Sequence, residues 1–555
     1  MIRPALLAAG LAVLSAPSVA AAAALLIHGG SIYTGVPWRP KVEAVVARDG
    51  KIVFTGSLAE ARTRAAGARD IDLKGAAAYP GFTDAHAHLT GIGMREMTLN
   101  LDQVKSVAEL VAVVKAYAAE HPGTDPIQGR GWIETHWPEH RFPTRQDLDA
   151  AVPDRPVWLE RSDGHAAVAN SAALKFAGVT AATRAPSGGE ILKDASGEPT
   201  GMLVDNAMDL VNAKMPAPTP ALVKEAVRRG AELYAARGWT AIGNMSVSAA
   251  DMAAIDALAA EGTMPIRTDN YLDLEAAGRV LKEGPYPDPT GKAWVMGVKM
   301  YMDGALGSRG AALLEPYSDS PSSTGLIKLD HDLAESVFDR ALRSGAQIAI
   351  HAIGDRANRW TLDWYQEAFA RNPEAARAVA LPRWRIEHAQ NVTPQDQPRF
   401  AKLGVIASMQ ASHAIGDLYF APERLGEARL AYAYPWKSLL EQGAVLAGGT
   451  DAPVEVGDPR IEFYAAVYRH DLKGKAEAGW HLEQALGRQE ALRMLTWGGA
   501  YAARKEAERG TLEVGKDADL TAFSADLMVV PPADILTARP VLTVVGGEVV
   551  HEALK

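Results

Sequence analysis

The stretch Phe82–Leu89, FTDAHAHL, decides the fold of this chain. It follows the turn-forming residues Tyr79-Pro80-Gly81 and places two histidines, His86 and His88, at positions i and i+2. Alternate side chains of an extended strand point to the same side, so both imidazoles are expected to face one way. Two imidazoles on one side of a strand end form half of a metal site, which predicts further ligands later in the chain.

Seven further strand-like segments follow, and helix-like segments separate them. They are TAIGNMS from Thr240, IRTDNYL from Ile266, VMGVKMY from Val295, QIAIH ending at His351, WRIEH ending at His388, VIASMQ from Val405 and AVLAGGTD ending at Asp451. Alternating strands and helices are typical of a parallel sheet with helical crossovers. Eight strands are the number in a TIM-type (β/α)8 barrel, so we predict an α/β protein with this barrel over residues 80–504.

The spacing of the strands is regular except between Leu89 and Thr240, where the chain is far longer than one crossover helix requires. This excess predicts a large insertion after the first barrel strand, over about residues 95–225, lying above the barrel mouth. Both ends of the chain contain strand-like pieces with hairpin turns, at Asp49-Gly50 and Gly546-Gly547. These pieces predict one small β-sandwich built from both termini, residues 25–79 and 505–555.

The first residues have the pattern of a leader. Arg3 precedes an apolar run that Pro17 interrupts, and small residues follow in an A-x-A-like pattern. We predict a signal peptide over residues 1–24 and a periplasmic or secreted location. The alternative is an uncleaved membrane anchor, but the uninterrupted apolar core is shorter than the roughly 20 residues that a span requires. No stable membrane span is expected after removal of the leader.

Composition excludes several classes of function. The chain is 48% hydrophobic and 22% charged, as is usual for soluble globular proteins. Its net charge is −10 and it has no Lys/Arg-rich run, so nucleic acid is not an expected partner. It has no Cys, so an exported protein would fold without disulfides. The expected partner is a small-molecule substrate, and the oligomeric state is left open, with a homodimer as one option.

Polar side chains interrupt the apolar strands at their C-terminal ends. They are His86 and His88 on the first strand, Lys299 on the fourth, His351 on the fifth, His388 on the sixth and Asp451 on the eighth. A barrel brings all these strand ends to one face, where such barrels carry their active sites. Imidazole and carboxylate ligands suit Zn²⁺ or a similar first-row divalent ion, so the pattern predicts a metal centre.

Lys299 is the unusual member of this group, because a metal would repel an ammonium and burial favours the neutral amine. One interpretation is a catalytic or substrate-binding lysine. The other is a neutral amine that reacts with CO₂ to form a carbamate, whose two oxygens could bridge two metal ions. The sequence leaves both open.

Several further motifs are spread over nearly the whole mature chain: PGFTDAHAHL, GRGWIETHWP, PVWLERSDGHAAVANSAAL, PTGMLVDNAMDLV, VKMYMDGALGSRGAAL, IHAIGD, IEHAQ, SMQASHAIGD and GGTDAPVE. Together they resemble the amidohydrolase superfamily, and most of all the branch that contains N-substituted formamide deformylases, amidohydrolase family 3. The resemblance implies a sandwich built from both termini and an insertion after the first barrel strand. It is specific for the branch and poorly specific for a substrate.

The resemblance also implies a ligand set and substrate contacts. His86, His88 and Asp451 would hold one metal ion, His351 and His388 a second, and carbamylated Lys299 would bridge them; the superfamily includes sites with one ion and with two. Candidates for substrate contact are His165, Asp303, Arg309 and His413, with Asp163 and Asp417 in the same motifs. The alternative for His165 is a structural histidine, and for Asp303 and Arg309 it is a salt bridge that holds their loop.

The expected reaction is hydrolysis of a non-peptide carbon–nitrogen amide bond, in substrates such as N-substituted formamides or N-acyl amines. A bound zinc ion lowers the pKa of water to about 7, and the resulting hydroxide would attack the carbonyl with Asp451 as general base and then general acid. The same site would serve an ester, lactone or dipeptide hydrolase. A deaminase or isomerase of the same superfamily and a non-catalytic binding protein are further alternatives.

Overall fold

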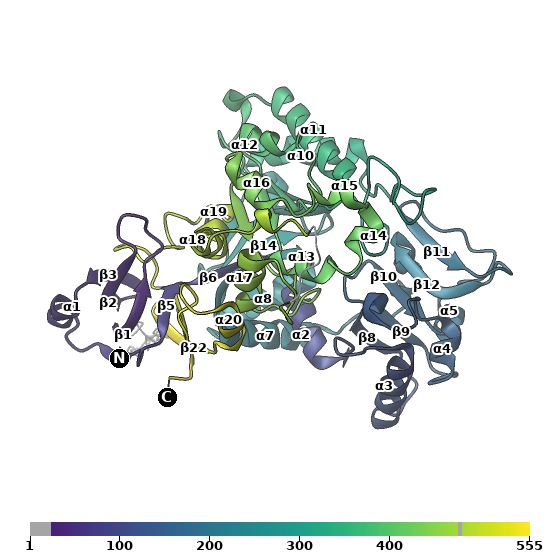
Figure 1. Ribbon diagram of the computed structural model, residues 1–555, viewed down its shortest axis with the longest axis horizontal. Helices are drawn as coiled ribbons and strands as arrows, with labels where there is room; N and C mark the ends of the chain where they lie inside the picture. Colours follow the sequence, from purple (N-terminus) through teal and green to yellow (C-terminus); the bar gives the residue numbers. More distant parts are fainter. Residues whose placement is uncertain (1–23, 475–479, 555) are drawn as a thin grey trace, which may run out of the picture.

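The computed structural model describes residues 24–474 and 480–554. Its centre is a barrel of eight parallel strands (Figure 1). The strands are β6 (Phe82–Ala87), β13 (Trp239–Val247), β14 (Arg267–Leu272), β16 (Ala293–Tyr301), β17 (Gln347–Ala352), β18 (Arg385–His388), β19 (Ile406–Met409) and β20 (Leu446–Gly448). Just after β20, the backbone N–H of Asp451 donates to the carbonyl oxygen of His86 at 2.6 Å, so the last strand end meets the first. The predicted TIM-type α/β barrel is confirmed.

Helices surround the barrel and connect its strands. They include α2 (Leu89–Met97), α7 (Pro220–Arg237), α8 (Ala249–Ala260), α10 (His331–Ser344), α11 (Asp355–Arg371), α12 (Gln397–Leu403), α13 (Ala411–Asp417), α16 (Trp436–Glu441), α17 (Pro459–Tyr468) and α18 (Arg488–Arg493). Their limits follow from local chemistry. The hydroxyl of Thr219 accepts from the Leu222 N–H at the start of α7, and Gly238, at φ 103°, ends that helix and leads directly into β13.

The segment between β6 and β13 forms a separate unit with a six-stranded sheet, at the right of Figure 1. Its strands are β7 (Leu99–Asn100), β8 (Ile127–Trp132), β9 (Val157–Arg161), β10 (Ala166–Ala169), β11 (Gly189–Lys193) and β12 (Pro199–Asp205), and its helices are α3 (Val107–Glu120), α4 (Arg145–Asp149), α5 (Ser171–Ala177) and α6 (Asp209–Asn212). Two apolar cores of its own stabilise this unit. One is built around Trp132 and Trp137, and the other is built around Trp158. The inserted segment is therefore a packed unit and not a linker.

Both ends of the chain contribute strands to a third sheet, at the left of Figure 1. Its strands are β1 (Leu25–Tyr33), β2 (Lys41–Arg48), β3 (Lys51–Gly56), β4 (Arg69–Asp72), β5 (Ala77–Pro80), β21 (Leu520–Phe523), β22 (Pro540–Val545) and β23 (Glu548–Glu552). Hydrogen bonds join all eight strands, from both ends of the chain, into one continuous sheet. β1 pairs with β2 along one edge and with β4 and β5 along the other, which leaves no break between two sheets.

An aromatic cluster joins this terminal sheet to the base of the barrel. The ring of Phe82, the first residue of β6, packs edge-on against Trp239 at 6.2 Å and against Phe523 at 5.6 Å between ring centroids. Tyr79 of β5 lies 6.0 Å from the same ring. The strand that carries His86 is thus held at its start by rings from β5, β13 and β21, on three different parts of the chain.

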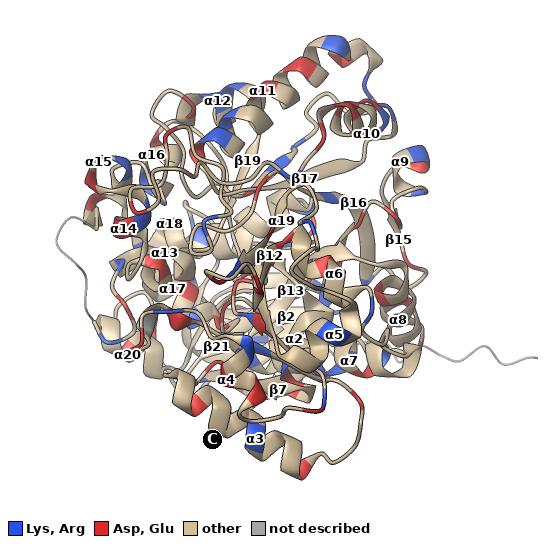
Figure 2. Cartoon of the chain, turned by 90° about the vertical axis from the view of Figure 1, so that its right-hand side faces the viewer, with Lys and Arg blue, Asp and Glu red and all other residues tan. Residues whose placement is uncertain are grey.

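The predicted signal peptide, residues 1–24, lies outside the described residues apart from Ala24. Within the part of the chain that the structure describes, no helix combines the length and the apolar character that a membrane crossing requires. Figure 2 shows Lys and Arg interspersed with Asp and Glu on the helices that face the viewer, such as α3, α10 and α11.

Candidate metal centre

The two histidines of the first barrel strand face the barrel mouth with their Nε2 atoms. His86 is fully buried in β6, and its Nδ1 donates to the Glu387 carboxylate at 2.6 Å. His88 is the residue before α2, and its Nδ1 donates to the carbonyl oxygen of Met245 at 3.1 Å. Because both Nδ1 atoms are bound to acceptors, the proton sits on Nδ1 and the Nε2 lone pairs remain for a metal.

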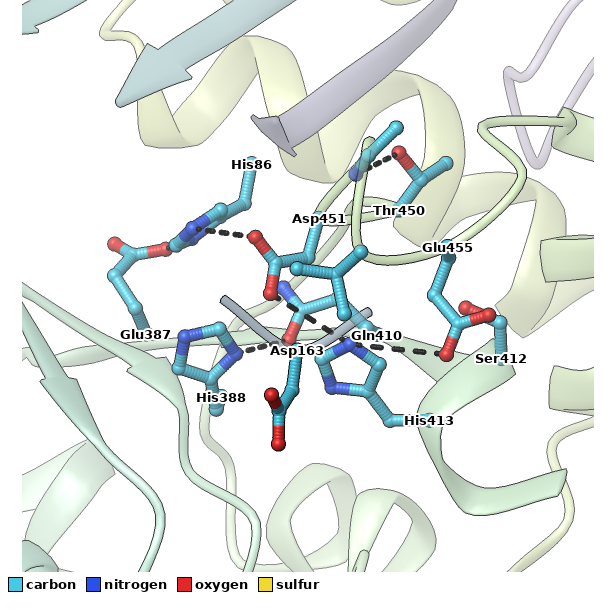
Figure 3. Close-up of polar contacts among 12 residues, drawn as sticks. His86, Asp163, Glu387, His388, Gln410, Ser412, His413, Thr450, Asp451 and Glu455 are labelled. Atoms are coloured by element: carbon cyan, nitrogen blue, oxygen red, sulfur yellow. Dashed lines mark hydrogen bonds and ion pairs between the residues drawn. The ribbon is translucent and has the colours of Figure 1, made fainter. Parts of the chain in front are cut away.

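Asp451 lies between the imidazoles of His86 and His413 (Figure 3). Its Oδ1 is 3.1 Å from Nε2 of His88 and 3.4 Å from Nε2 of His86, and its Oδ2 is 3.6 Å from Nε2 of His413. Burial alone would raise the pKa of this carboxyl, but the surrounding histidines outweigh burial and hold its pKa well below the usual value. Asp451 has φ 57°, a left-handed conformation that is uncommon outside glycine and that clusters at functional sites.

The other two strand-end histidines pack against each other. The rings of His351 and His388 have centroids 4.5 Å apart, and His388 in turn lies 4.8 Å from His86. Nδ1 of His388 is bound to the Gln410 amide oxygen at 2.8 Å. Burial lowers the pKa of both His351 and His388 far below the usual value, so both are neutral imidazoles near pH 7 and can act as ligands.

Lys299 points into the same group from β16. Its Nζ lies 3.2 Å from Nε2 of His86. Burial lowers the pKa of Lys299 to about 8, although the Glu387 and Asp451 carboxylates act in the opposite direction. A substantial share of neutral amine is therefore present near pH 8.

These donors fit a metal ion. One ligand atom each from His86, His88 and Asp451 lie within 4.8 Å of one another, and the same holds for His388, His413 and Asp451. Buried imidazole nitrogens with a carboxylate are the ligands that Zn²⁺ takes in proteins.

Two cavities meet at this centre. We call the larger one, of about 390 Å³, the outer cavity; Arg130, Tyr301 and Lys328 line it. We call the smaller one, of about 200 Å³, the inner cavity. Both share a wall formed by Asp163, His165, His351, His388, Asp451 and Val454. A substrate in either cavity therefore has the metal ligands beside it.

The inserted unit brings His165 to this wall. His165 lies between β9 and β10, and its ring centroid is 5.0 Å from that of His351. Its Nδ1 donates to Oδ1 of Asp205 at 2.7 Å, and Lys328 Nζ contacts the same oxygen at 3.3 Å. Because Asp205 occupies Nδ1 of His165, Nε2 is the ring nitrogen that remains available to the cavities.

Two of the expected substrate contacts lie elsewhere. Asp303 is fully buried and accepts three backbone N–H groups, from Ala312, Ile353 and Gly354, at 2.8–3.0 Å. It lines neither cavity, and it holds the chain around His351, whose Nε2 is 3.5 Å away. Arg309 forms an ion pair with Asp319 at 2.8 Å and also lines neither cavity. Both side chains stabilise the loop that follows β16, which agrees with the alternative role that the sequence left open for them.

Sequence reasoning missed three residues that orient the ligands: Glu387, Gln410 and Asp205. Glu387 had a detectable signal, since an acidic residue one position before His388 and two after Arg385 is unusual in a buried strand. Arg385 binds both carboxylate oxygens of Glu387, at 2.7 and 2.9 Å. Burial would raise the pKa of Glu387, but Arg385 and His86 hold it far below its usual value.

Known proteins resemble the chain over almost its whole length. A family model described as the amidohydrolase family matches residues 69–551. The YtcJ protein of Bacillus subtilis (strain 168) is 33% identical, over 95% of this chain and 99% of that protein. The N-substituted formamide deformylase of Arthrobacter pascens is 27% identical, over 95% of this chain and 98% of that enzyme.

Solved structures agree with this result. A crystal structure of an uncharacterized metal-dependent hydrolase from Pyrococcus horikoshii is 29% identical, with a TM-score of 0.74, and covers 92% of this chain and 99% of that one. The family model spans far more than half of the sequence, including both the barrel and the metal centre. The chain is therefore a metal-dependent hydrolase that belongs to the amidohydrolase family.

Proposed function

We propose that this protein hydrolyses non-peptide carbon–nitrogen amide bonds in small molecules such as N-substituted formamides and N-acyl amines. One observation carries the proposal: the two oxygens of Asp451 face different groups. Oδ1 lies beside the Nε2 atoms of His86 and His88, whereas Oδ2 is directed toward His413 and the inner cavity. The similarity to a formamide deformylase supports the choice of bond.

His86, His88 and Asp451 would hold one metal ion. His351 and His388, whose rings pack against each other, would hold a second. We take the ion to be Zn²⁺, because neutral imidazoles and a carboxylate suit it. A divalent ion at this place supplies a Lewis acid that polarises a carbonyl and lowers the pKa of water to about 7. Glu387 and Met245 keep the two first-strand imidazoles in the tautomer that can bind it.

Lys299 would carry a carbamate in the active protein. Its neutral amine adds to the carbon of CO₂, a nitrogen–carbon bond forms, and one proton is released to water. The product is an anion with two oxygens, attached to a nitrogen that lies 3.2 Å from Nε2 of His86. This change removes the positive charge that would otherwise oppose metal binding.

Asp451 would move the proton. Its carboxylate accepts a proton from the attacking water at Oδ2 and passes that proton to the nitrogen of the leaving amine. In its imidazolium form, with the Nδ1 proton held by Asp205, His165 would donate from Nε2 to the carbonyl oxygen. His413, on the other side of Asp451, would contact the substrate in the inner cavity.

The test is a metal analysis of the purified mature protein, combined with a panel of N-formyl amines, N-acyl amines, esters, lactones and dipeptides. We expect bound zinc and turnover of the amides. Asp451→Asn should abolish turnover while at least one metal ion remains bound. Turnover of esters or lactones alone would replace the proposed reaction, and full activity of the metal-loaded Asp451→Asn variant would refute its mechanism.

We also propose that the protein is exported, on the leader pattern of residues 1–24. Expression of the full chain in a bacterial host, followed by N-terminal sequencing of the periplasmic fraction, tests this. A mature protein that begins near residue 25 is expected, and an intact N-terminus found only in the membrane fraction would favour the anchor.

A further inference from the structure

The inner cavity contains two carboxylates that form no ion pair with Lys or Arg among the described residues. Asp417, the last residue of α13, uses only Oδ2 in hydrogen bonds, from Gln390 at 2.8 Å and Tyr434 at 2.5 Å. Nothing within residues 24–474 and 480–554 donates to its Oδ1. Among the residues that the structure describes, Glu455 has one ion-pair partner, Nε2 of His413 at 3.9 Å (Figure 3).

Arg161 does not supply the missing positive charge. It is the one Lys or Arg side chain of the described residues that lines this cavity. Its guanidinium donates to Glu134 at 2.8 and 3.2 Å and is also bound to the carboxylate of Asp163. Arg161 is therefore already paired with two carboxylates, Glu134 and Asp163, and forms no ion pair with Asp417 or Glu455.

An independent observation marks the same space as a binding site. His413 is only 8% exposed, and its Nε2 has no hydrogen-bond partner among the described residues. This atom is directed between Asp451, at 3.6 Å, and Glu455, at 3.9 Å. A buried polar atom without a partner is costly, so a polar ligand group in the inner cavity would relieve that cost.

The raised pKa values of the Asp417 and Glu455 carboxyls are consistent with a site that binds a cationic ligand group. Burial raises the pKa of Asp417 to about 7, because Tyr434 and Arg161 only partly offset the loss of water. Burial also raises the pKa of Glu455 well above its usual value, and the neighbouring Glu462 and Asp417 add to the rise. A bound positive charge would favour the ionised form of both groups.

The position of Asp451 determines which part of the substrate lies in the inner cavity. Its Oδ2 faces His413 and the inner cavity, so a proton passed from Oδ2 reaches a leaving nitrogen on that side. The remaining wall includes Leu306, Ile353 and Phe420, which can cover a short chain of methylene groups. The volume, about 200 Å³, is below the roughly 300 Å³ at the lower end of drug-sized pockets, so the group it takes is small.

We propose that the inner cavity binds the amine side of the substrate and that this amine carries a second, positively charged nitrogen, held by Asp417 and Glu455. The substrate class is then a mono-N-acyl or mono-N-formyl diamine. This inference rests on the proposed function for the identity of the bond that is cleaved.

The first test compares three amides whose tails differ only in charge: mono-N-formyl-1,4-diaminobutane, N-pentylformamide and N-formyl-5-aminopentanoate, with the N-acetyl series beside them. Released formate or acetate is measured with the zinc-loaded enzyme.

We expect kcat/KM for the cationic amide to exceed that for the neutral one by about ten- to a hundredfold, which is the value of a hydrogen bond to a charged group. Asp417→Asn and Glu455→Gln should lower this ratio, whereas Glu275→Gln, which changes an exposed carboxylate on the loop after β14, should leave the ratio unchanged. Equal rates for cationic and neutral amides would overturn the inference.

The second test separates this inference from the proposed function. Methanesulfonamides with the same cationic and neutral tails cannot be hydrolysed as amides, and their binding to the zinc-loaded protein is measured by calorimetry. Tighter binding of the cationic tail, lost in Asp417→Asn, supports the inner-cavity site even if no amide is cleaved, in which case the proposed function alone fails. Equal binding of both tails overturns the site even if amides are cleaved.

Discussion

The carboxylate of Glu387 accepts a hydrogen bond from Nδ1 of His86 at 2.6 Å, although 301 positions separate the two residues in the chain. Both side chains are fully buried, and Arg385 holds the far side of the carboxylate. The imidazole is therefore fixed in one tautomer and one orientation before any metal arrives. Mutation of such partners typically lowers metal affinity or activity by about 10- to 100-fold.

Replacing Glu387 by Gln should weaken metal binding by about 10- to 100-fold, because the amide holds the imidazole less firmly and makes it a poorer donor. Zinc affinity is measured by competition with a chromogenic chelator. Glu506→Gln is the matched control, since Glu506 also pairs with an arginine, Arg383, but lies away from the metal centre. Unchanged zinc affinity in Glu387→Gln would contradict the orientation argument.

Replacing Lys299 by Met should remove the amine and leave a side chain of similar length. We expect purified wild-type protein, incubated with ¹³C-bicarbonate, to show a carbamate resonance by NMR that Lys299→Met lacks. The variant should also lose part of its bound metal, because a bridging anion is gone. A wild-type spectrum without the resonance, in protein that is fully active, would exclude the carbamate and leave Lys299 as a neutral or charged amine.

Replacing Asp205 by Asn should reduce kcat by about ten- to a hundredfold, because the neutral amide supports His165 less well in donating a proton to the carbonyl oxygen. Metal content and KM should change little, since Asp205 touches neither the metal ligands of the first strand nor the inner cavity. Asp154→Asn, which removes an exposed carboxylate of the same inserted unit, is the control. A loss of metal equal to the loss of kcat would point to a purely structural effect.

Glu462 on α17 should make stability depend on pH. Its carboxyl is buried and accepts the backbone N–H groups of Ala411 and Ser412 at 2.8 and 3.1 Å. Burial raises its pKa to about 8, and the nearby Asp84 adds to the rise. The folded protein therefore keeps a proton that the unfolded chain loses above about 4.5, so this contribution is complete below that pH and is lost as the pH rises toward about 8.

Urea unfolding at pH 5.5 and at pH 8 measures this effect. Wild type should lose free energy of unfolding between the two values, and Glu462→Gln should lose less, because its amide does not titrate. Glu441→Gln, an exposed carboxylate on α16, should behave as wild type does. An identical pH response of Glu462→Gln and wild type would show that the carboxyl has an ordinary pKa.

The barrel could be predicted because its signals are local. Each of the eight strands is an apolar run, and the residues that interrupt these runs, such as His86, His351 and Asp451, stand at strand ends. The structure brings these three residues and His88, Lys299 and His388 to one place. The hydrogen bonds that orient them could not be predicted, because they join elements whose neighbours depend on the order of strands around the barrel.

Asp303 and Arg309 illustrate most clearly the limit of predicting side-chain contacts from the sequence. Their motif pointed to the active site, yet Asp303 binds backbone N–H groups and Arg309 binds Asp319. A loop can direct a side chain into a cavity or away from it with small changes in backbone angles, and the residue types are the same in both cases.

What the amino-acid order determined by itself was the eight-stranded pattern and the kinds of ligand at the strand ends, since strand periodicity and side-chain chemistry are properties of short segments. Only the tertiary structure decided that the terminal strands form one sheet and that Glu387 and Asp205 orient His86 and His165. It also decided that Asp417 and Glu455 face the inner cavity with no Lys or Arg ion-pair partner among the described residues. These features depend on distances between side chains far apart in the chain, and packing of the whole barrel with its inserted unit sets those distances.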